Sequence, residues 1–299
     1  MILSAILLSA AAGIPAPAVV VEPAIAATLL EGEIPKPPPT AVAEAKRRAT
    51  ALKALESRLP EGLSDQDQVR AAVRRAVAAS VALGEDSETG RVLKQACRRA
   101  LAASAKTPKA AALLVDLVRE GARRDLAFQP IMEAPLPKGF PWPVAAGEIQ
   151  VQEYPVYRKV VTGMQGSQQN GAFFKLFRHI TSNDIAMTAP VEMTMGENEM
   201  LDMAFLYGKP DMGSAGEAGR VEVTDIEPMT VVSIGIRGTT RNVTGGESMA
   251  KLEAWLERNK DQWEQAGNPR LMGYNGPMTP RSKQFCEIQI PIRAKAASE

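Results

Sequence analysis

The chain has 299 residues, of which 45% are hydrophobic and 23% are charged, and its formal net charge is +1. This length and composition are typical of an ordinary globular protein of about two domains. The small net charge gives no whole-chain reason to expect a nucleic-acid partner. Cys97 and Cys286 lie far apart without metal-ligand spacing, so we interpret them as two unrelated buried thiols.

The first 27 residues, 1–27, resemble a secretory signal peptide. Residues 1–14 are almost wholly apolar, which is too short for a membrane span and suits the hydrophobic region of a signal. Ala24 and Ala26 form an A-x-A-like cleavage site, although no Lys or Arg precedes the apolar run. We therefore expect export to a periplasmic or envelope-associated location. The alternative is a membrane-associated or disordered alanine-rich leader.

Two proline-rich stretches divide the rest of the chain. The first predicts a stiff linker over 28–39, and the second predicts a linker over 128–147 that contains a domain boundary. The region between them, 40–127, carries apolar residues at helical spacing. We expect it to fold as an all-α bundle or as two helical hairpins.

Residues with helix-capping side chains mark where these helices begin. Thr40, Ser64 and Ser87 each precede an apolar run at helical spacing, and the Thr107-Pro108 pair is favoured at a helix start. The pattern therefore predicts four helices.

The polar faces of the predicted helices are basic. They carry Arg-Arg pairs at 47–48, 74–75, 98–99 and 123–124. Two interpretations stay open: a surface for an anionic membrane at residues 40–126, or a solvated helix face. No aromatic residues interleave with the charges, so we expect no nucleic-acid partner.

The remaining sequence, 148–293, has the pattern of an α+β domain. Strands are predicted over 149–163, 201–207, 221–238 and 285–292, the third of them split near Pro228. Helices are predicted over 171–181 and after Gly246. Both halves have the order strand, helix, strand, strand, which predicts a pseudo-two-fold sheet or barrel with both helices packed on it.

The stretch Ile185–Met195 alternates strictly between two sets of side chains. This period predicts one strand whose methionine-rich face packs under the preceding helix, with Pro190 at an edge or a bend. Glu192 falls on the other face, where we expect an isolated carboxylate, as for Asp202 in the next strand.

Three groups of residues resemble the SOUL heme-binding protein family. They are the aromatic helix with the run after it (Phe173, Phe174, Leu176, Phe177, Ile180, then Ala186-Met187-Thr188-Ala189-Pro190-Val191), the run Tyr274-Asn275-Gly276-Pro277, and Glu153-Tyr154-Pro155. The resemblance implies a distorted β-barrel of two βαββ repeats flanked by two helices. It also implies a shallow apolar groove beside the first helix that binds heme or another tetrapyrrole.

Carried onto this sequence, the resemblance implicates the outer flank of the helix over 171–181. Phe174 can stack on a flat macrocycle, and Arg178 can pair with a propionate. His179, the only histidine, is a possible axial ligand of heme iron, and the alternative is a half-exposed helix residue. Met164 is a weaker candidate at the end of the preceding strand.

Catalytic motifs are absent from the sequence. One histidine leaves little scope for a triad, and no paired metal ligands or phosphate-binding loop occur. We therefore expect a non-enzymatic carrier or buffer of heme or porphyrin, which takes a small hydrophobic planar ligand. The alternative is a protein- or membrane-interaction module that docks through the basic helices and uses the barrel as a scaffold.

Overall fold

The computed structural model describes residues 36–57, 61–164, 169–197, 199–238, 246–276 and 278–295. The predicted signal peptide and most of the first linker lie outside these described residues. Within these ranges, every helix is too short or too polar to serve as a membrane span.

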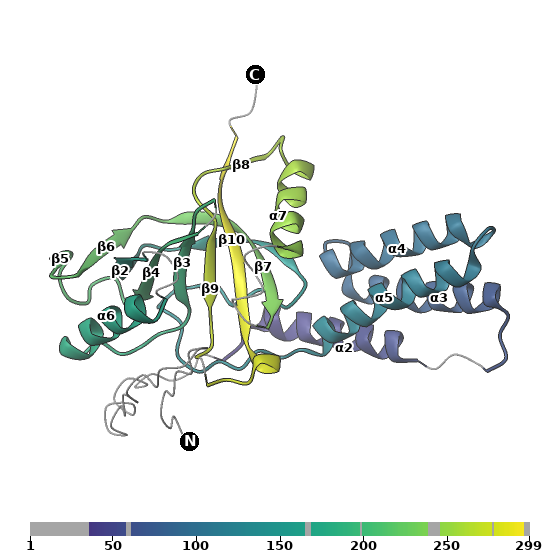
Figure 1. Ribbon diagram of the computed structural model, residues 1–299, viewed down its shortest axis with the longest axis horizontal. Coiled ribbons are helices and arrows are strands. Elements are labelled where there is room, and N and C mark those ends of the chain that lie inside the picture. The colour runs from purple at the N-terminus through teal and green to yellow at the C-terminus, as the bar shows by residue number, and fades with distance from the viewer. Residues whose placement is uncertain are drawn as a thin grey trace, which may run out of the picture.

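Four helices precede the sheet and pack together as a bundle (Figure 1). They are α2 (Pro39–Glu56), α3 (Asp65–Leu83), α4 (Glu88–Ser104) and α5 (Pro108–Ala127). Their shared core is rich in buried alanine, which lets the helices approach closely, and Leu55 and Leu93 fill the remaining space. The four predicted helices are therefore present.

Side-chain caps begin two of these helices as predicted. Ser64 accepts a hydrogen bond from the backbone N–H of Asp67 at 3.2 Å, and Ser87 accepts one from Gly90 at 3.0 Å. The prediction for Thr40 was wrong, because α2 already begins at Pro39 and Thr40 lies inside its first turn. Proline suits that position, since the first helical N–H groups have no partner within the helix.

Replacing Ser64 with alanine should destabilise the start of α3. Loss of an N-cap side chain costs about 1 kcal/mol, because one backbone N–H loses its acceptor. Hydrogen exchange at Asp67 should therefore accelerate in Ser64→Ala. Ser104→Ala is the matched control, because the Ser104 hydroxyl donates to Leu101 at the end of α4 and accepts no helix N–H in the described structure. Equal acceleration in both variants would contradict the capping role.

Ten strands among the described residues form one antiparallel sheet, in the order β1-β7-β10-β9-β3-β4-β2-β6-β5, with β8 paired to β10. The strands are β1 (Ile149–Tyr154), β2 (Tyr157–Gly163), β3 (Val191–Met195), β4 (Met200–Leu206), β5 (Gly216–Ala218), β6 (Val221–Ile226), β7 (Met229–Arg237), β8 (Trp263–Gln265), β9 (Arg270–Gly273) and β10 (Phe285–Ala294). Helices α6 (Gln169–Ser182) and α7 (Glu247–Arg258) and a short 3₁₀ turn, η2 (Arg281–Lys283), complete this region. The α+β class is confirmed. The sheet is barrel-like but not closed, because its edge strands β1 and β5 do not pair with each other.

Two predicted strands differ from the structure at prolines. The single strand predicted over 149–163 is two strands, β1 and β2, which separate at Pro155. The strand predicted over Ile185–Met195 begins only at Val191, directly after Pro190. Proline has no N–H to donate to a strand ladder, which explains both boundaries. The methionine-rich face was predicted correctly, because Met193 and Met195 are buried in the core that also includes α6.

The sheet has the internal two-fold symmetry that the repeated pattern predicted. Strands β2, β4 and β3 form one half, β7, β10 and β9 form the other, and β3 pairs with β9 between them. Tyr157, the first residue of β2, lies opposite Ile226, the last residue of β6. Met229, the first residue of β7, lies opposite Tyr154, the last residue of β1. The register of β6 against β2 is therefore the same as that of β1 against β7, so β6 and β1 occupy equivalent positions in the two halves. Helix α6 follows β2 and α7 follows β7, so these two helices are also equivalent.

The two faces of the sheet have different covers. Helices α6 and α7 cover one face, and residues 128–147, predicted as a linker, pack across the other. We call this segment the strap. The Phe140 ring of the strap meets Tyr154 and Tyr157 edge-on, with centroid distances of 4.9 and 5.1 Å. The backbone N–H of Ala189 donates to the carbonyl of Pro135 at 3.0 Å. The strap is therefore part of the packed structure around the sheet.

The two cysteines are buried in different cores and are free thiols, as predicted. Cys97 lies in the helical bundle, and Cys286 lies in β10. Burial raises the pKa of the Cys286 thiol to about 12. A thiol with so high a pKa is a poor nucleophile at neutral pH, which favours a structural role.

Candidate ligand-binding site

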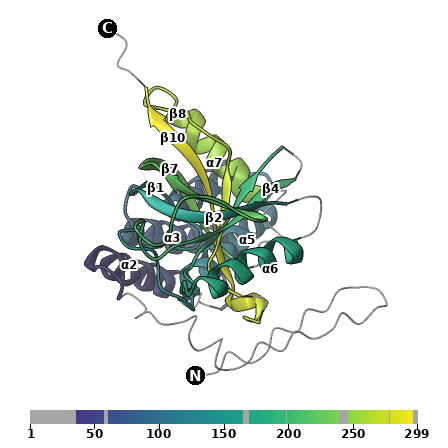
Figure 2. The same cartoon turned by 90° about the vertical axis from the view of Figure 1, so that its left-hand side faces the viewer.

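A groove with a volume of about 490 Å³ lies between the outer flank of α6 and the start of β6. Its lining residues come from α6, from the turn after it and from the β5–β6 region: Gly171, Phe174, Lys175, Arg178, His179, Ser182, Asn183, Ala218, Arg220 and Val221. We call it the α6 groove. Figure 1 shows α6 at the end of the sheet away from the helical bundle, and Figure 2 shows α6 in front of the sheet with the bundle behind.

Helical spacing determines which α6 side chains reach the groove. Leu176 and Ile180 are buried against the sheet, as predicted. Phe174 and Arg178 lie on the other flank and line the groove. The Phe174 ring also meets the Phe173 ring edge-on at 6.1 Å, and aromatic packing therefore holds the apolar wall of the groove in place.

The groove is rich in positive charge. Lys175, Arg178 and Arg220 line it, and none of them forms an ion pair with a carboxylate in the described parts of the chain. Arg178 and Arg220 are exposed. An aromatic wall beside these basic side chains suits a flat apolar ligand that carries negative groups at its edge.

His179 lines the groove but already has a partner. Its Nε2 atom lies 2.8 Å from the hydroxyl oxygen of Tyr207, a buried residue that follows β4. Burial lowers the pKa of His179, which favours the neutral imidazole. A neutral ring can ligate iron, but Nε2 is engaged, so only Nδ1 is left for a ligand.

Met164 does not line this groove. Its side chain is buried in the core with the strand residues, consistent with the common use of methionine as adaptable core filler. Sequence reasoning did not identify Lys175 or Arg220. Lys175 could have been found, because it lies three residues before Arg178 and four before His179, one helical turn away. Arg220 could not, because only the folded sheet brings it beside α6.

The Arg-Arg pairs of the bundle are partly used inside the protein. Arg48 is buried and contacts Glu148, Arg75 donates to the carbonyl of Ser57, and Arg123 pairs with Glu120. Fewer arginine side chains are therefore free to contact a membrane than the sequence indicated. Membrane binding through residues 40–126 stays a prediction.

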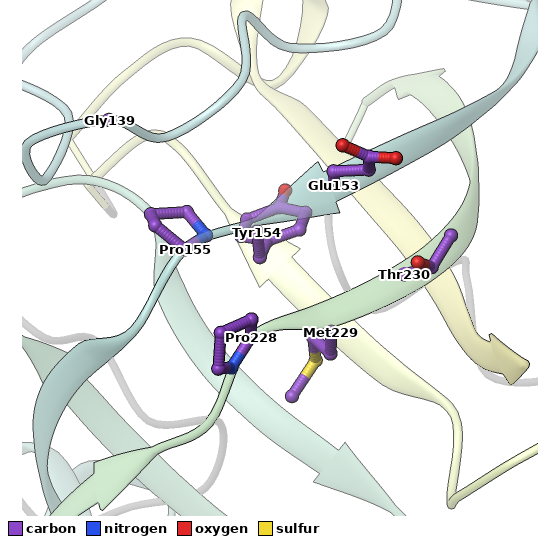
Figure 3. Close-up of a pocket in the computed structure, with 7 residues that line it drawn as sticks. All are labelled: Gly139, Glu153, Tyr154, Pro155, Pro228, Met229 and Thr230. Carbon is purple, nitrogen blue, oxygen red and sulfur yellow. The ribbon is translucent and has the colours of Figure 1, made fainter.

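A second groove of about 430 Å³ lies where β1 and β7 meet the strap (Figure 3). It is lined by Gly139, Glu153, Tyr154, Pro155, Pro228, Met229 and Thr230. Among these described lining residues, Glu153 alone is charged, and it carries a negative charge. This groove is therefore less suited to a ligand with negative groups than the α6 groove is.

The prediction that Glu192 is an isolated carboxylate was wrong. Glu192 is buried, and it accepts hydrogen bonds from Lys159 at 2.5 Å, Tyr157 at 2.9 Å and Arg270 at 3.1 Å. Burial alone would disfavour its charged form, but the nearby Arg270 and Lys159 charges hold the pKa of Glu192 below its usual range. Its partners come from β2 and β9, so no local sequence pattern could reveal them.

The contacts of Glu192 extend into a buried polar network beneath the strap. Arg270 donates to Gln289 at 2.9 Å and stacks over the Tyr154 ring at 4.7 Å, while its Nη2 atom has no protein partner in the described structure. Gln289 donates to Glu287, which also accepts the backbone N–H of Val144 from the strap. Neither groove is lined by Glu192 or Arg270. The network therefore joins strands and strap rather than facing a ligand.

The described residues hold no group of three or more His, Cys, Asp or Glu side chains that could bind a metal ion. An α+β fold that carries an exposed groove with an aromatic wall and basic side chains has the features of a ligand-binding module. The sequence profile of the SOUL heme-binding protein matches residues 141–291, which is more than half of the chain. The chain belongs to the SOUL heme-binding protein family.

Similarity to other known proteins is distant. No curated protein matches the chain by sequence. The EcmrR–DNA complex contains a chain with 16% identity and a TM-score of 0.39; the match covers 48% of this chain and only 57% of that one. The EcmrR C-terminal domain has 14% identity and a TM-score of 0.39, and the match covers 49% of this chain and 97% of that domain. A hydrolase from Listeria innocua has 11% identity and a TM-score of 0.38, and the match covers 50% of this chain and 94% of that one.

Proposed function

We propose that the protein binds a tetrapyrrole, heme or porphyrin, in the α6 groove and serves as a non-enzymatic carrier or buffer. The single observation that carries this proposal is the position of Phe174 beside three cations, Lys175, Arg178 and Arg220, that have no ion-pair partner among the described residues. A tetrapyrrole offers a flat apolar ring and carboxylates at one edge. The groove volume of about 490 Å³ is also in the usual range for small-molecule sites.

Binding would then depend on stacking and on charge pairing at the edge of the ring. Phe174 supplies an apolar surface for the macrocycle, and Arg178 and Arg220 can donate to the propionates. Because His179 Nε2 is engaged by Tyr207, we propose that iron ligation is not required. Bound heme would supply the redox and ligand chemistry of its iron.

A titration of the full chain with hemin and with iron-free protoporphyrin IX tests this proposal. We expect a saturable shift of the Soret band with both compounds. The double variant Arg178→Ala/Arg220→Ala should bind about tenfold more weakly, since a tenfold change corresponds to about 1.4 kcal/mol of lost charge-assisted contact. Arg281→Ala, which removes an exposed arginine of η2 outside the groove, is the matched control.

The same titration separates stacking from iron ligation. His179→Phe should leave the affinities for hemin and protoporphyrin within about twofold of the wild-type values, a difference of roughly 0.4 kcal/mol. A selective loss of hemin affinity in this variant would instead assign His179 as an axial ligand. Absence of any saturable shift at micromolar protein would refute the proposed function.

A further inference from the structure

The internal symmetry gives the α6 groove a counterpart on the other half of the sheet. Arg220 and Val221 bring the start of β6 to the α6 groove. The matching residues at the start of β1 are Glu148 and Ile149, because β1 and β6 hold the same register against their partners. The counterpart groove should therefore lie between the start of β1 and α7.

The two helices also correspond residue by residue at their centres and ends. Leu176 in α6 and Leu252 in α7 are both fully buried against the sheet. Ser182, the last residue of α6, lines the α6 groove, and Arg258 is the last residue of α7. Glu148 at the start of β1 and Arg258 at the end of α7 therefore lie on the two sides of the position that corresponds to the α6 groove.

The helical bundle occupies this position. Glu148 accepts hydrogen bonds from the backbone N–H of Glu88 at 2.9 Å, from the Ser87 hydroxyl at 3.0 Å and from Arg48 at 3.4 Å. Arg258 pairs with Glu88 at 3.4 Å. Arg48, Glu88 and Glu148 are all more than nine-tenths buried, so these contacts exclude solvent.

Charge explains why the bundle lies on this side of the sheet. The start of α4 presents unpaired N–H groups and a positive helix dipole, which favour an adjacent carboxylate. Glu148 supplies that carboxylate, whereas its counterpart Arg220 is a cation that would repel a helix start. Figure 1 shows the bundle on the α7 side of the sheet and α6 at the far end.

We infer that the counterpart of the α6 groove, between the start of β1 and α7, is a docking site for a helix N-terminus, filled within the same chain by α4 and α2, so that only the α6 groove of this symmetric pair is open to a ligand. The docking part stands on the contacts of Glu148 and Arg258. The ligand stoichiometry of one rests on the proposed function.

Hydrogen exchange on the full chain tests the docking. In Glu148→Ala, amide exchange over residues 87–91 should accelerate by about tenfold or more, while amides of β10 keep their wild-type rates. Glu153→Ala, which removes an exposed carboxylate of β1 away from the bundle, should change neither segment. Unchanged protection of 87–91 in a folded Glu148→Ala variant would overturn the inference.

A milder variant keeps the test decisive if Glu148→Ala does not fold. Arg258→Ala removes only the contact to Glu88 from a partly exposed side chain. It should accelerate exchange at 87–91 by about threefold, and an unchanged rate there would count against docking.

A titration with protoporphyrin IX tests the stoichiometry. The full chain should bind one equivalent, and binding of two equivalents with similar affinity would overturn the one-groove inference. No binding at all would refute the proposed function instead, and the exchange experiment would still decide whether the docking site is real.

Discussion

Replacing Glu192 with alanine should lower the free energy of unfolding by about 3–5 kcal/mol, because it leaves the buried charge of Arg270 and the half-buried charge of Lys159 without their carboxylate. Arg270 is 4% exposed and Glu192 is 2% exposed, so water cannot replace the lost partner. Urea denaturation followed by circular dichroism measures this loss. Glu222→Ala, which removes an exposed carboxylate of β6, is the matched control and should change stability by less than about 0.5 kcal/mol.

The contribution of Glu192 should also depend on pH. Its pKa is lower in the folded protein than its usual value of 4.5, so the folded state binds fewer protons than the unfolded state at acidic pH. The stabilisation is therefore present above pH 4.5 and lost as the pH falls through the folded pKa. The difference in the free energy of unfolding between the wild type and Glu192→Gln should therefore shrink as the pH falls from 4.5 through the folded pKa of Glu192. A difference below about 1 kcal/mol at pH 7 for Glu192→Ala would contradict the role of the network.

Leu176→Ala and Leu252→Ala form a matched pair given by the internal symmetry. Both side chains are fully buried beneath a helix, so each truncation should cost about 2–5 kcal/mol through lost burial and the cavity that remains. Their effects on a ligand should differ. Leu176 supports α6 and the groove, so its truncation should weaken protoporphyrin binding, whereas Leu252→Ala should bind normally.

Urea denaturation and porphyrin titration of the same samples measure both effects, under conditions where both variants are folded. Leu176→Met, a replacement of similar volume, should cost less than about 1.5 kcal/mol and retain binding. Equal loss of affinity in Leu176→Ala and Leu252→Ala would place the ligand away from α6.

Features that depend on short-range chemistry were predictable from the sequence. The caps at Ser64 and Ser87 are local, because a hydroxyl accepts an N–H from the same chain segment. The buried stripe of α6 follows from the 3.6-residue period, which also put Phe174 and Arg178 on its outer flank. The predicted strands over 149–163 and Ile185–Met195 missed the boundaries at Pro155 and Pro190, because proline interrupts a ladder without specifying whether the strand bends there or ends.

Features that depend on tertiary contacts were not predictable. Alternation correctly placed Glu192 on the face opposite the methionines, but it could not show that Lys159 and Arg270 from other strands neutralise it there. The proline content of 128–147 indicated the absence of regular structure, and it gave no sign that Phe140 packs between two tyrosines. Arg220 reaches the α6 groove only because β6 pairs with β2.

Binding of a tetrapyrrole in the α6 groove is the central claim, and paramagnetic hemin can locate the ligand directly. In nitrogen-15 spectra of the full chain, equimolar hemin should broaden the backbone signals of Phe174, Arg178 and Val221. Signals of Leu252 in α7 and of Glu153 beside the second groove should stay sharp. Broadening centred on α7 or on the second groove, or no broadening at all, would contradict the account.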